Sequence, residues 1–374
     1  MPRLLILFSL CNLVIGAGAF MITGILELTA RGLGVSVPAA GQAITAYALA
    51  TALLAPLLLL ATGRWPRRRV LMLGLTLFTL GNVACALADT LPLLPAGQML
   101  MGLGSLYTPV AAAGALSLVE PARRGQALSV EVLVISLSYG VGLPLRAWLG
   151  FAQGCRASLW VAVGASALAW GAVALWVPRQ LPASGMQWAG LGTLLCRLNV
   201  LLTLGLTLLY FTAIFTVFAY IGPVLQALAP MSSGRLSLTL MLSGVSGVSG
   251  TLIGGAANDR HGPLRTLRVR VRVRVLSLAL ALALMKAVLP LARGNWGWLV
   301  AVMLLWGTAG FGMMAPQQMR LALMAPAQAL LLLLLNTSML YLGTALGTAV
   351  SGAAGGSSAW TTYPGWAWFL LSFA

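Results

Sequence analysis

The stretch Gly254-Gly-Ala-Ala-Asn-Asp-Arg-His-Gly-Pro-Leu-Arg265 is the most informative loop sequence in this chain. It combines glycines and a proline with an Asp-Arg pair and a further arginine, and long apolar runs lie on both sides of it. A short basic loop between apolar segments is typical of polytopic membrane proteins, because basic residues gather in the loops on one side of the bilayer.

The composition supports a membrane protein. Of the 374 residues, 60% are hydrophobic and only 7% are charged, whereas soluble domains have about 45–50% and about 25%. So few charges could not cover a surface in water, but lipid removes that requirement. The apolar character extends over the whole chain, so the first run after Arg3 is a span and not a cleaved signal peptide.

A helix that crosses a bilayer needs about 20 mainly apolar residues. The sequence predicts eleven full spans and a twelfth that is too short, at 366–374. The predicted spans are 4–26, 39–62, 70–89, 92–118, 126–149, 157–177, 199–228, 235–257, 275–292, 298–323 and 327–351.

The basic residues predict the orientation. Sixteen of the 22 Lys and Arg residues lie in alternate loops counted from the N-terminus, which places the N-terminus in the cytoplasm. The cytoplasmic set is Arg3, Arg64, Arg67, Arg68, Arg69, Arg123, Arg124, Arg179, Arg197, Arg260, Arg265, Arg268, Arg270, Arg272, Arg274 and Arg320. The Arg-Val alternation over 268–274 has two interpretations, binding of anionic lipid headgroups or simple expansion of a basic loop.

The order of the predicted spans and basic loops divides the chain into two halves. We expect an N-terminal six-helix bundle over 1–178, a cytoplasmic linker over 179–198, and a C-terminal bundle over 199–374 with five full helices and a partial sixth. The loop Gly63-Arg-Trp-Pro-Arg-Arg-Arg69 occupies in the first half the place that 254–265 occupies in the second. Internal repeats of this kind are common in secondary transporters.

With these two loops in corresponding halves, the sequence resembles the major facilitator superfamily. Its loop signature, Gly-x-x-x-Asp-Arg-x-Gly-x-x-Arg, matches Gly255, Asp259, Arg260, Gly262 and Arg265. A second resemblance, to the signature of the family's antiporters, lies in Gly140-Val-Gly-Leu-Pro-Leu-Arg-Ala-Trp-Leu-Gly150. The detail is most similar to the drug/proton antiporter branch, in the arabinose-efflux-permease-like group. The supporting stretches are 40–50, 218–223 and 336–347.

The resemblance implies an all-α fold of two six-helix bundles and export of a small molecule, a sugar, nucleoside or drug, by proton-coupled alternating access. It implies that the 255–265 loop acts as a cytoplasmic gate, and that span 5 carries the signature residues Gly140, Gly142, Pro144 and Gly150. It also implies a plasma-membrane location, in the inner membrane of a bacterium. An uncoupled facilitator, or a truncated membrane protein that does not transport, are the alternatives.

Proton coupling needs a titratable group near the cavity, and the chain has only five acids. Glu131 in span 5 and Glu27 near the outer end of span 1 are the candidates, because ionisable residues within spans are costly and mark function. Snorkelling to the interface is the alternative for both.

In the resembled fold, spans 1, 4, 7 and 10 line the cavity, and span 2 packs on span 11 and span 5 on span 8. Small residues recur on spans 2, 5, 8 and 11, so we expect them to lie where the two halves slide. Polar and aromatic residues that could contact a substrate are Asn12, Gln98, Tyr107, Tyr210, Tyr220, Trp306, Gln317 and Asn336.

Other classes of function find little support. A net charge of +17 would suggest nucleic acid in a soluble protein, but here it sets orientation. One histidine, His261, and four separate cysteines show no metal-site spacing. The scattered acids offer no catalytic cluster, so we expect neither an enzyme nor a cofactor. The expected partners are a small molecule, protons and the bilayer, and the expected state is a monomer.

Overall fold

The computed structural model describes residues 2–19, 21–118, 134, 137–138, 142–179, 191–261, 295–311, 314–325 and 328–355. The regular elements within these ranges are helices. Most of the predicted spans match them, and several spans consist of two helices separated by a break.

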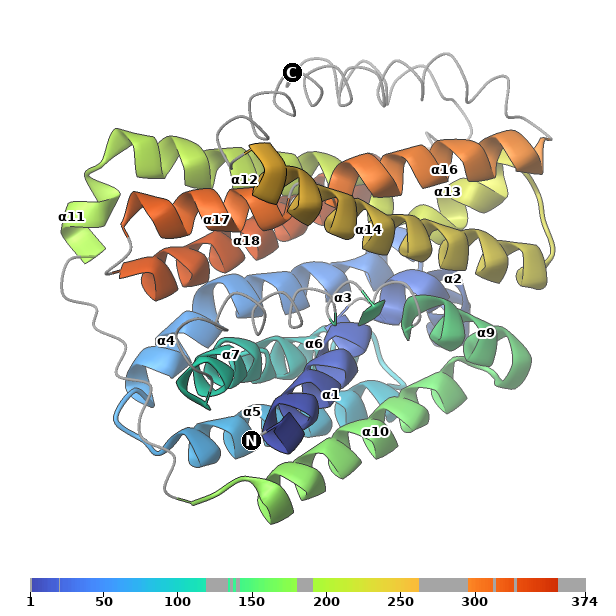
Figure 1. The fold of residues 1–374 in the computed structure, drawn as a ribbon. Coiled ribbons are helices and arrows are strands. Elements are labelled where there is room, and N and C mark those ends of the chain that lie inside the picture. Colours follow the sequence, from blue (N-terminus) through green and yellow to red (C-terminus); the bar gives the residue numbers. More distant parts are fainter. Residues whose placement is uncertain are drawn as a thin grey trace.

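The N-terminal half contains the first six spans, of which span 5 is described mainly at its second end (Figure 1). Its helices are α1 (Pro2–Ala19), α2 (Met21–Leu33), α3 (Val37–Leu49), α4 (Ala55–Ala61), α5 (Arg67–Ala86), α6 (Leu93–Gly104), α7 (Tyr107–Leu118), α9 (Leu143–Gln153) and α10 (Cys155–Trp176), with a π-helical turn, η1 (Ala50–Leu54), between α3 and α4.

The C-terminal half contains spans 7, 8, 10 and 11, together with a short helix within the segment 179–198. Span 9, expected at 275–292, and the short apolar segment at 366–374 lie outside the described residues. The helices are α11 (Leu191–Leu195), α12 (Leu198–Phe218), α13 (Ile221–Leu228), α14 (Ser233–His261), α16 (Trp296–Phe311), α17 (Met314–Met324) and α18 (Ala329–Gly355).

Local sequence explains where these helices start and bend. Ser36 caps α3, because its hydroxyl accepts a hydrogen bond from the backbone N–H of Ala39 at 3.3 Å. Pro56, at the start of α4, has no N–H to donate to the preceding turn, and the π-helical turn η1 directly precedes it. Gly154 has a φ of +91° and joins α9 to α10 in a tight turn.

The helices suit a lipid environment. Six of them, within the part of the chain that the structure describes, are long and apolar enough to cross a bilayer. Large apolar side chains point outward from them, such as Leu168 and Leu175 on α10, which are 77% and 79% exposed. Lipid accepts such side chains at no cost, because no water contacts them.

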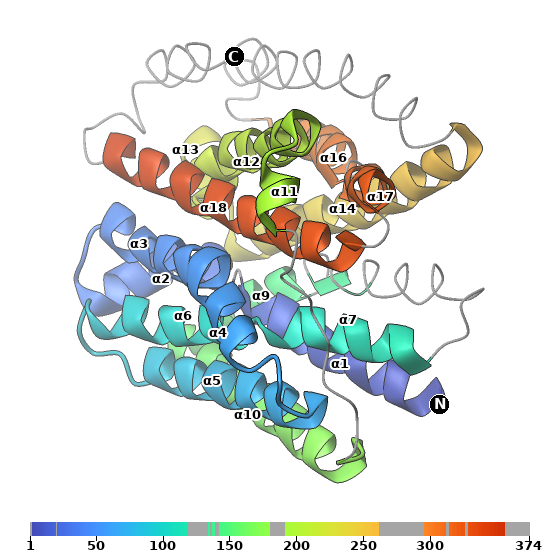
Figure 2. The same ribbon diagram turned by 90° about the vertical axis from the view of Figure 1, so that its left-hand side faces the viewer.

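The two halves contact each other at one end of the molecule. Helix α18 packs along α3 and η1, α9 packs on α14, and α2 packs on α13. The packing of span 2 on span 11 and of span 5 on span 8 confirms the expectation. This end holds the end of α2 and the starts of α10 and α14, and it lies to the right in Figure 1. Figure 2 shows α18 lying between α3 and α12.

Candidate functional site

A hydrogen bond joins the first and fourth spans inside the N-terminal half. The hydroxyl of Thr108, in the first turn of α7, donates to Oδ1 of Asn12 on α1 at 2.9 Å. Asn12 is 3% exposed, and the neighbouring Tyr107 is fully buried. Because an unpaired amide inside an apolar bundle is costly, this bond fixes α1 against α7.

The second predicted amide of this half, Gln98, lies between two neighbouring helices. Its Nε2 faces the sulfur atoms of Cys85 on α5, at 3.7 Å, and Met101 on α6, at 3.6 Å. Sulfur is a weak hydrogen-bond acceptor, so these contacts hold the amide only loosely.

The C-terminal half contains a larger polar cluster. Gln317 Nε2, on α17, donates to the carbonyl oxygen of Thr203 at 2.8 Å and to the hydroxyl of Thr207 at 2.9 Å, both on α12. The Thr207 hydroxyl donates in turn to Oδ1 of Asn336 on α18 at 2.7 Å. All four residues are buried, and Gln317 Oε1 has no hydrogen-bond partner.

Two members of this cluster, Gln317 and Asn336, are predicted from the sequence, whereas Thr203 and Thr207 are not. The available signal was their spacing, since two hydroxyl residues four positions apart in an apolar run share one face of a helix. The cluster ties α12, α17 and α18 together with neutral groups alone.

Aromatic rings follow the polar cluster along α12. Tyr210 contacts Phe211 edge-on at 5.5 Å between ring centroids, and Phe211 stacks on Phe215 at 6.2 Å. Phe215 meets Phe218 at 5.6 Å, and Phe218 meets Trp306 of α16 at 5.9 Å. Tyr210 and Trp306, both predicted, therefore belong to one chain of rings that joins spans 7 and 10.

Tyr220 lies elsewhere. It occupies the break between α12 and α13, is fully buried, and packs against Gly41 of α3 in the other half. The structure thus places this predicted cavity residue at the contact between the halves.

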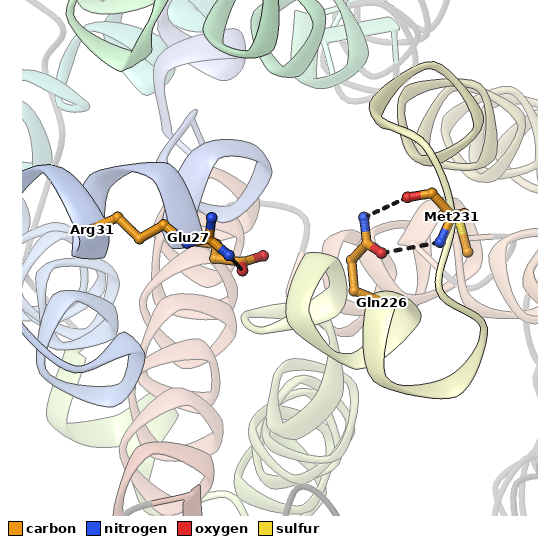
Figure 3. Close-up of polar contacts among 4 residues, drawn as sticks. All are labelled: Glu27, Arg31, Gln226 and Met231. Atoms are coloured by element: carbon orange, nitrogen blue, oxygen red, sulfur yellow. Dashed lines mark hydrogen bonds and ion pairs between the residues drawn. The ribbon is translucent and has the colours of Figure 1, made fainter.

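Two acids, Glu27 and Asp89, lie in ion pairs near that same end of the molecule. Glu27 accepts a hydrogen bond from Arg31 one turn later on α2 at 2.6 Å, and its side chain is 38% exposed. Asp89 pairs with Arg156, and both of these side chains are exposed. Figure 3 shows the Glu27–Arg31 pair beside Gln226 of α13, whose amide binds both the N–H and the carbonyl of Met231.

Glu131, the other proton-coupling candidate, lies outside the described residues, as do Gly140, Gly262 and Arg265. The segment expected to form the gate loop, 255–265, is helical up to His261 in the structure. Helix α14 continues to His261, so Gly255, Asp259 and Arg260 belong to its last turns. The segment before Gly262 contains no proline and two helix-favouring alanines at 256–257, which allows the helix to continue past the apolar run.

The span 5 signature packs against span 1. A Cβ atom placed on Gly142 would lie 2.6 Å from Cβ of Ala17, and one on Gly150 would lie 2.6 Å from Cγ2 of Ile25. Pro144 stands in the first turn of α9, where a proline needs no N–H partner. These residues bring α9 close to α1 and α2 within the N-terminal half.

Comparison with known proteins settles the family. The model of the Major Facilitator Superfamily matches residues 8–348, which is most of the chain.

The chain belongs to the major facilitator superfamily.

It is therefore a multi-pass membrane transporter of small molecules, and not an enzyme. The Inner membrane transport protein YdhP of Escherichia coli (strain K12) is 31% identical over 342 residues, which cover 91% of this chain and 85% of that protein. The Chloramphenicol resistance protein of Streptomyces lividans is 29% identical over 279 residues, covering 72% and 70%. The drug and arabinose efflux-like branch expected from the sequence is confirmed by these relatives and by the Putative transporter AraJ of Escherichia coli, at 24% identity.

Solved structures confirm the fold. The crystal structure of a D-xylose-proton symporter superposes with a TM-score of 0.80 at 16% sequence identity, covering 99% of this chain and 94% of the symporter. A nucleoside transporter, NupG, superposes with a TM-score of 0.73 at 13% identity.

The expectation was wrong for four glycines of spans 8 and 11, namely Gly247, Gly250, Gly343 and Gly347. A Cβ atom on Gly343 of α18 would lie 2.5 Å from the carbonyl oxygen of Leu208 on α12, and Gly347 faces the same helix. Gly247 and Gly250 of α14 face α16. All of these contacts lie within the C-terminal half, so this transporter uses the glycines to close its own bundle.

Proposed function

We propose that this transporter exports a small, neutral or weakly polar molecule in exchange for protons, by alternating access, with its N-terminus in the cytoplasm. The observation that carries the proposal is the chemistry of the polar groups inside the bundle. In the described residues the hydrogen bonds that join spans 1 and 4, and those that join spans 7, 10 and 11, are made by amides, hydroxyls and a backbone carbonyl, and aromatic rings follow them along span 7. Such groups suit a solute with hydrogen-bonding groups and apolar faces.

Export is supported by the relatives. A chloramphenicol resistance protein and a protein named as a chloramphenicol efflux pump, at 29% and 31% identity, share this sequence pattern over much of their length. Chloramphenicol, an uncharged molecule with an aromatic ring, is therefore the first substrate to test, ahead of sugars and nucleosides.

Proton exchange rests on Glu131. Glu27 lies in an ion pair with Arg31, and its side chain is 38% exposed, so it is not enclosed in the bundle. Glu131 is the remaining candidate within a span. A carboxyl group inside the bilayer is expensive when charged. Glu131 would therefore bind a proton when the transporter encloses it and release the proton when the transporter opens it to water.

Transport into inverted membrane vesicles tests the proposal. We expect radiolabelled chloramphenicol to accumulate when an inside-acid proton gradient is imposed, and accumulation to stop when the gradient is collapsed. A Glu131→Gln variant should lose gradient-driven accumulation and keep downhill exchange. Glu27→Gln is the matched control and should keep both.

Absence of gradient-dependent flux for every member of a panel of drugs, sugars and nucleosides would reject the proposal. Downhill flux that ignores the gradient in the parent protein would show an uncoupled facilitator. Full coupling in Glu131→Gln would reject that residue alone.

A further inference from the structure

Tyr220 stands at the contact between the two halves. The helix of span 7 breaks there, since Tyr220 has φ −115° and ψ 26° between α12 and α13. The side chain extends from the C-terminal half toward α3 of the N-terminal half, and it is fully buried. A tyrosine ring buries a large apolar area, so this one residue makes a substantial contact.

Two glycines form the surface that receives the ring. A Cβ atom on Gly41 of α3 would lie 2.6 Å from Cζ and 2.7 Å from Cε1 of Tyr220. One on Gly352 of α18 would lie 2.7 Å from the Tyr220 hydroxyl and 2.8 Å from Nε2 of Gln42. Real Cβ atoms essentially never approach closer than 3.0 Å, so a side chain at either position would force the Tyr220 ring or the Gln42 amide to move. We call Gly41 and Gly352 the glycine socket.

The socket belongs to both halves. Gly41 lies on α3 in the N-terminal half, whereas Gly352 and Tyr220 lie in the C-terminal half. Other contacts close the same end: Phe151 of α9 packs against the cluster that contains Ile221 and Leu225 of α13.

Farther along α3 and α18, Tyr47 meets Tyr341 edge-on, with 5.9 Å between ring centroids and 65° between planes. The glycine socket differs from these contacts, because any side chain added to it would push directly against the tip of the Tyr220 ring.

We propose that Tyr220 and the glycine socket form a latch that holds the two halves together at the α2–α13 end, and that the ring leaves the socket when this end opens. The latch rests on the proposed alternating access, in which the α2–α13 end faces the outside. A side chain added to the socket raises the free energy of this closed state and leaves the opposite state untouched. It therefore shifts the population toward the outward-open state.

Cysteine labelling tests the latch. Gly222, on α13, is buried beside α2, and a Cβ atom there would meet only the carbonyl oxygen of Thr23 at 3.9 Å. A Gly222→Cys reporter, in a background of Cys155→Ser and Cys196→Ser, fits without a clash. It reacts with a membrane-impermeant maleimide added to intact cells only when the α2–α13 end opens.

Gly41→Val should raise the labelling rate of this reporter by at least about fivefold, since overpacking a tight contact destabilises the state that contains it. Tyr220→Ala should raise it as well, because the latch loses its ring. The double variant Gly41→Val/Tyr220→Ala should return most of the way to the parent rate, because valine fills part of the vacated space.

Gly102→Ala is the matched control. A Cβ atom there would lie 2.5 Å from the carbonyl oxygen of Tyr47, so it would clash with backbone inside the N-terminal half and not with the Tyr220 ring. It should leave the reporter rate unchanged. If Gly41→Val does not fold, as judged by gel filtration, Gly41→Ala takes its place with a smaller shift in the same direction.

An unchanged rate in the Gly41 variant would overturn the latch, as would an equal rise in Gly102→Ala or a double variant that labels as fast as the singles. Labelling needs no substrate. A shift in labelling without proton-driven flux in the parent would therefore reject the proposed function and retain the latch.

Discussion

Two buried glutamines show how the surroundings of a single residue decide what it contributes. Gln98 and Gln317 lie on spans 4 and 10, which occupy corresponding places in the two halves, and they are 1% and 2% exposed. The amide of Gln317 donates to two oxygens on another helix, whereas that of Gln98 faces two sulfurs. The sequence alone predicts both as polar groups in the bundle and cannot tell these surroundings apart.

Replacing each glutamine by methionine separates the two environments. Gln317→Met keeps the volume but leaves the Thr203 carbonyl and the Thr207 hydroxyl without their donor, which should cost about 1–3 kcal/mol. Gln98→Met places a thioether among sulfur atoms and should cost less than about 1 kcal/mol. Thermal unfolding of the purified variants in detergent measures both. Equal losses would mean that the hydrogen bonds of Gln317 add nothing.

At the scale of the helix, the sequence predicts spans well and predicts helix faces poorly. Apolar runs place spans 2, 3 and 6 within a few residues of α3–α4, α5 and α10, because the bilayer thickness sets the length. The break at Tyr220 has a different signal, because Pro223 follows it and has no N–H to donate to the carbonyl four residues earlier. The glycines of α18 recur four residues apart, which indicates a close contact but not the neighbour: the contact is with α12 of the same half. Only the three-dimensional arrangement identifies that neighbour.

The packing of α18 on α12 gives a prediction at this scale. Gly343→Ala would bring a methyl group within 2.5 Å of the Leu208 carbonyl oxygen and should destabilise the protein by about 1–3 kcal/mol. Gly205→Ala on α12 meets nothing within 4 Å. It should be neutral or stabilising by up to about 1 kcal/mol, since alanine favours the helix.

The melting temperatures of the two variants, compared with that of the parent, check this expectation. The same variants also test whether the packing within the C-terminal bundle affects the opening of the α2–α13 end. Gly343→Ala should lower stability without changing the labelling rate of the Gly222→Cys reporter. A change in that rate would mean that the α12–α18 contact takes part in opening.

For the whole molecule, the extensive contacts between the halves in the described residues lie on the side of α2, α13 and the end of α18. Helix α11 lies at the opposite end, on the left of Figure 1. If the N-terminus is cytoplasmic, this is an inward-facing state. The basic loops predict that orientation, but they cannot predict which of the alternating states the structure adopts, because two states share one sequence and differ by a few kcal/mol.

The chain carries its own reporters of orientation. Cys11 and Cys85 are buried, Cys155 is half-buried and Cys196 is exposed. Cys155 begins α10 at the end where the halves meet, and Cys196 precedes α12 at the other end. Because a thiol must be accessible to react, an impermeant maleimide should label Cys196 in inverted vesicles and Cys155, more slowly, in intact cells. Cys155→Ser and Cys196→Ser variants assign each signal. Labelling of Cys196 from outside the cell would reverse the topology, and the state described here would then be outward-facing.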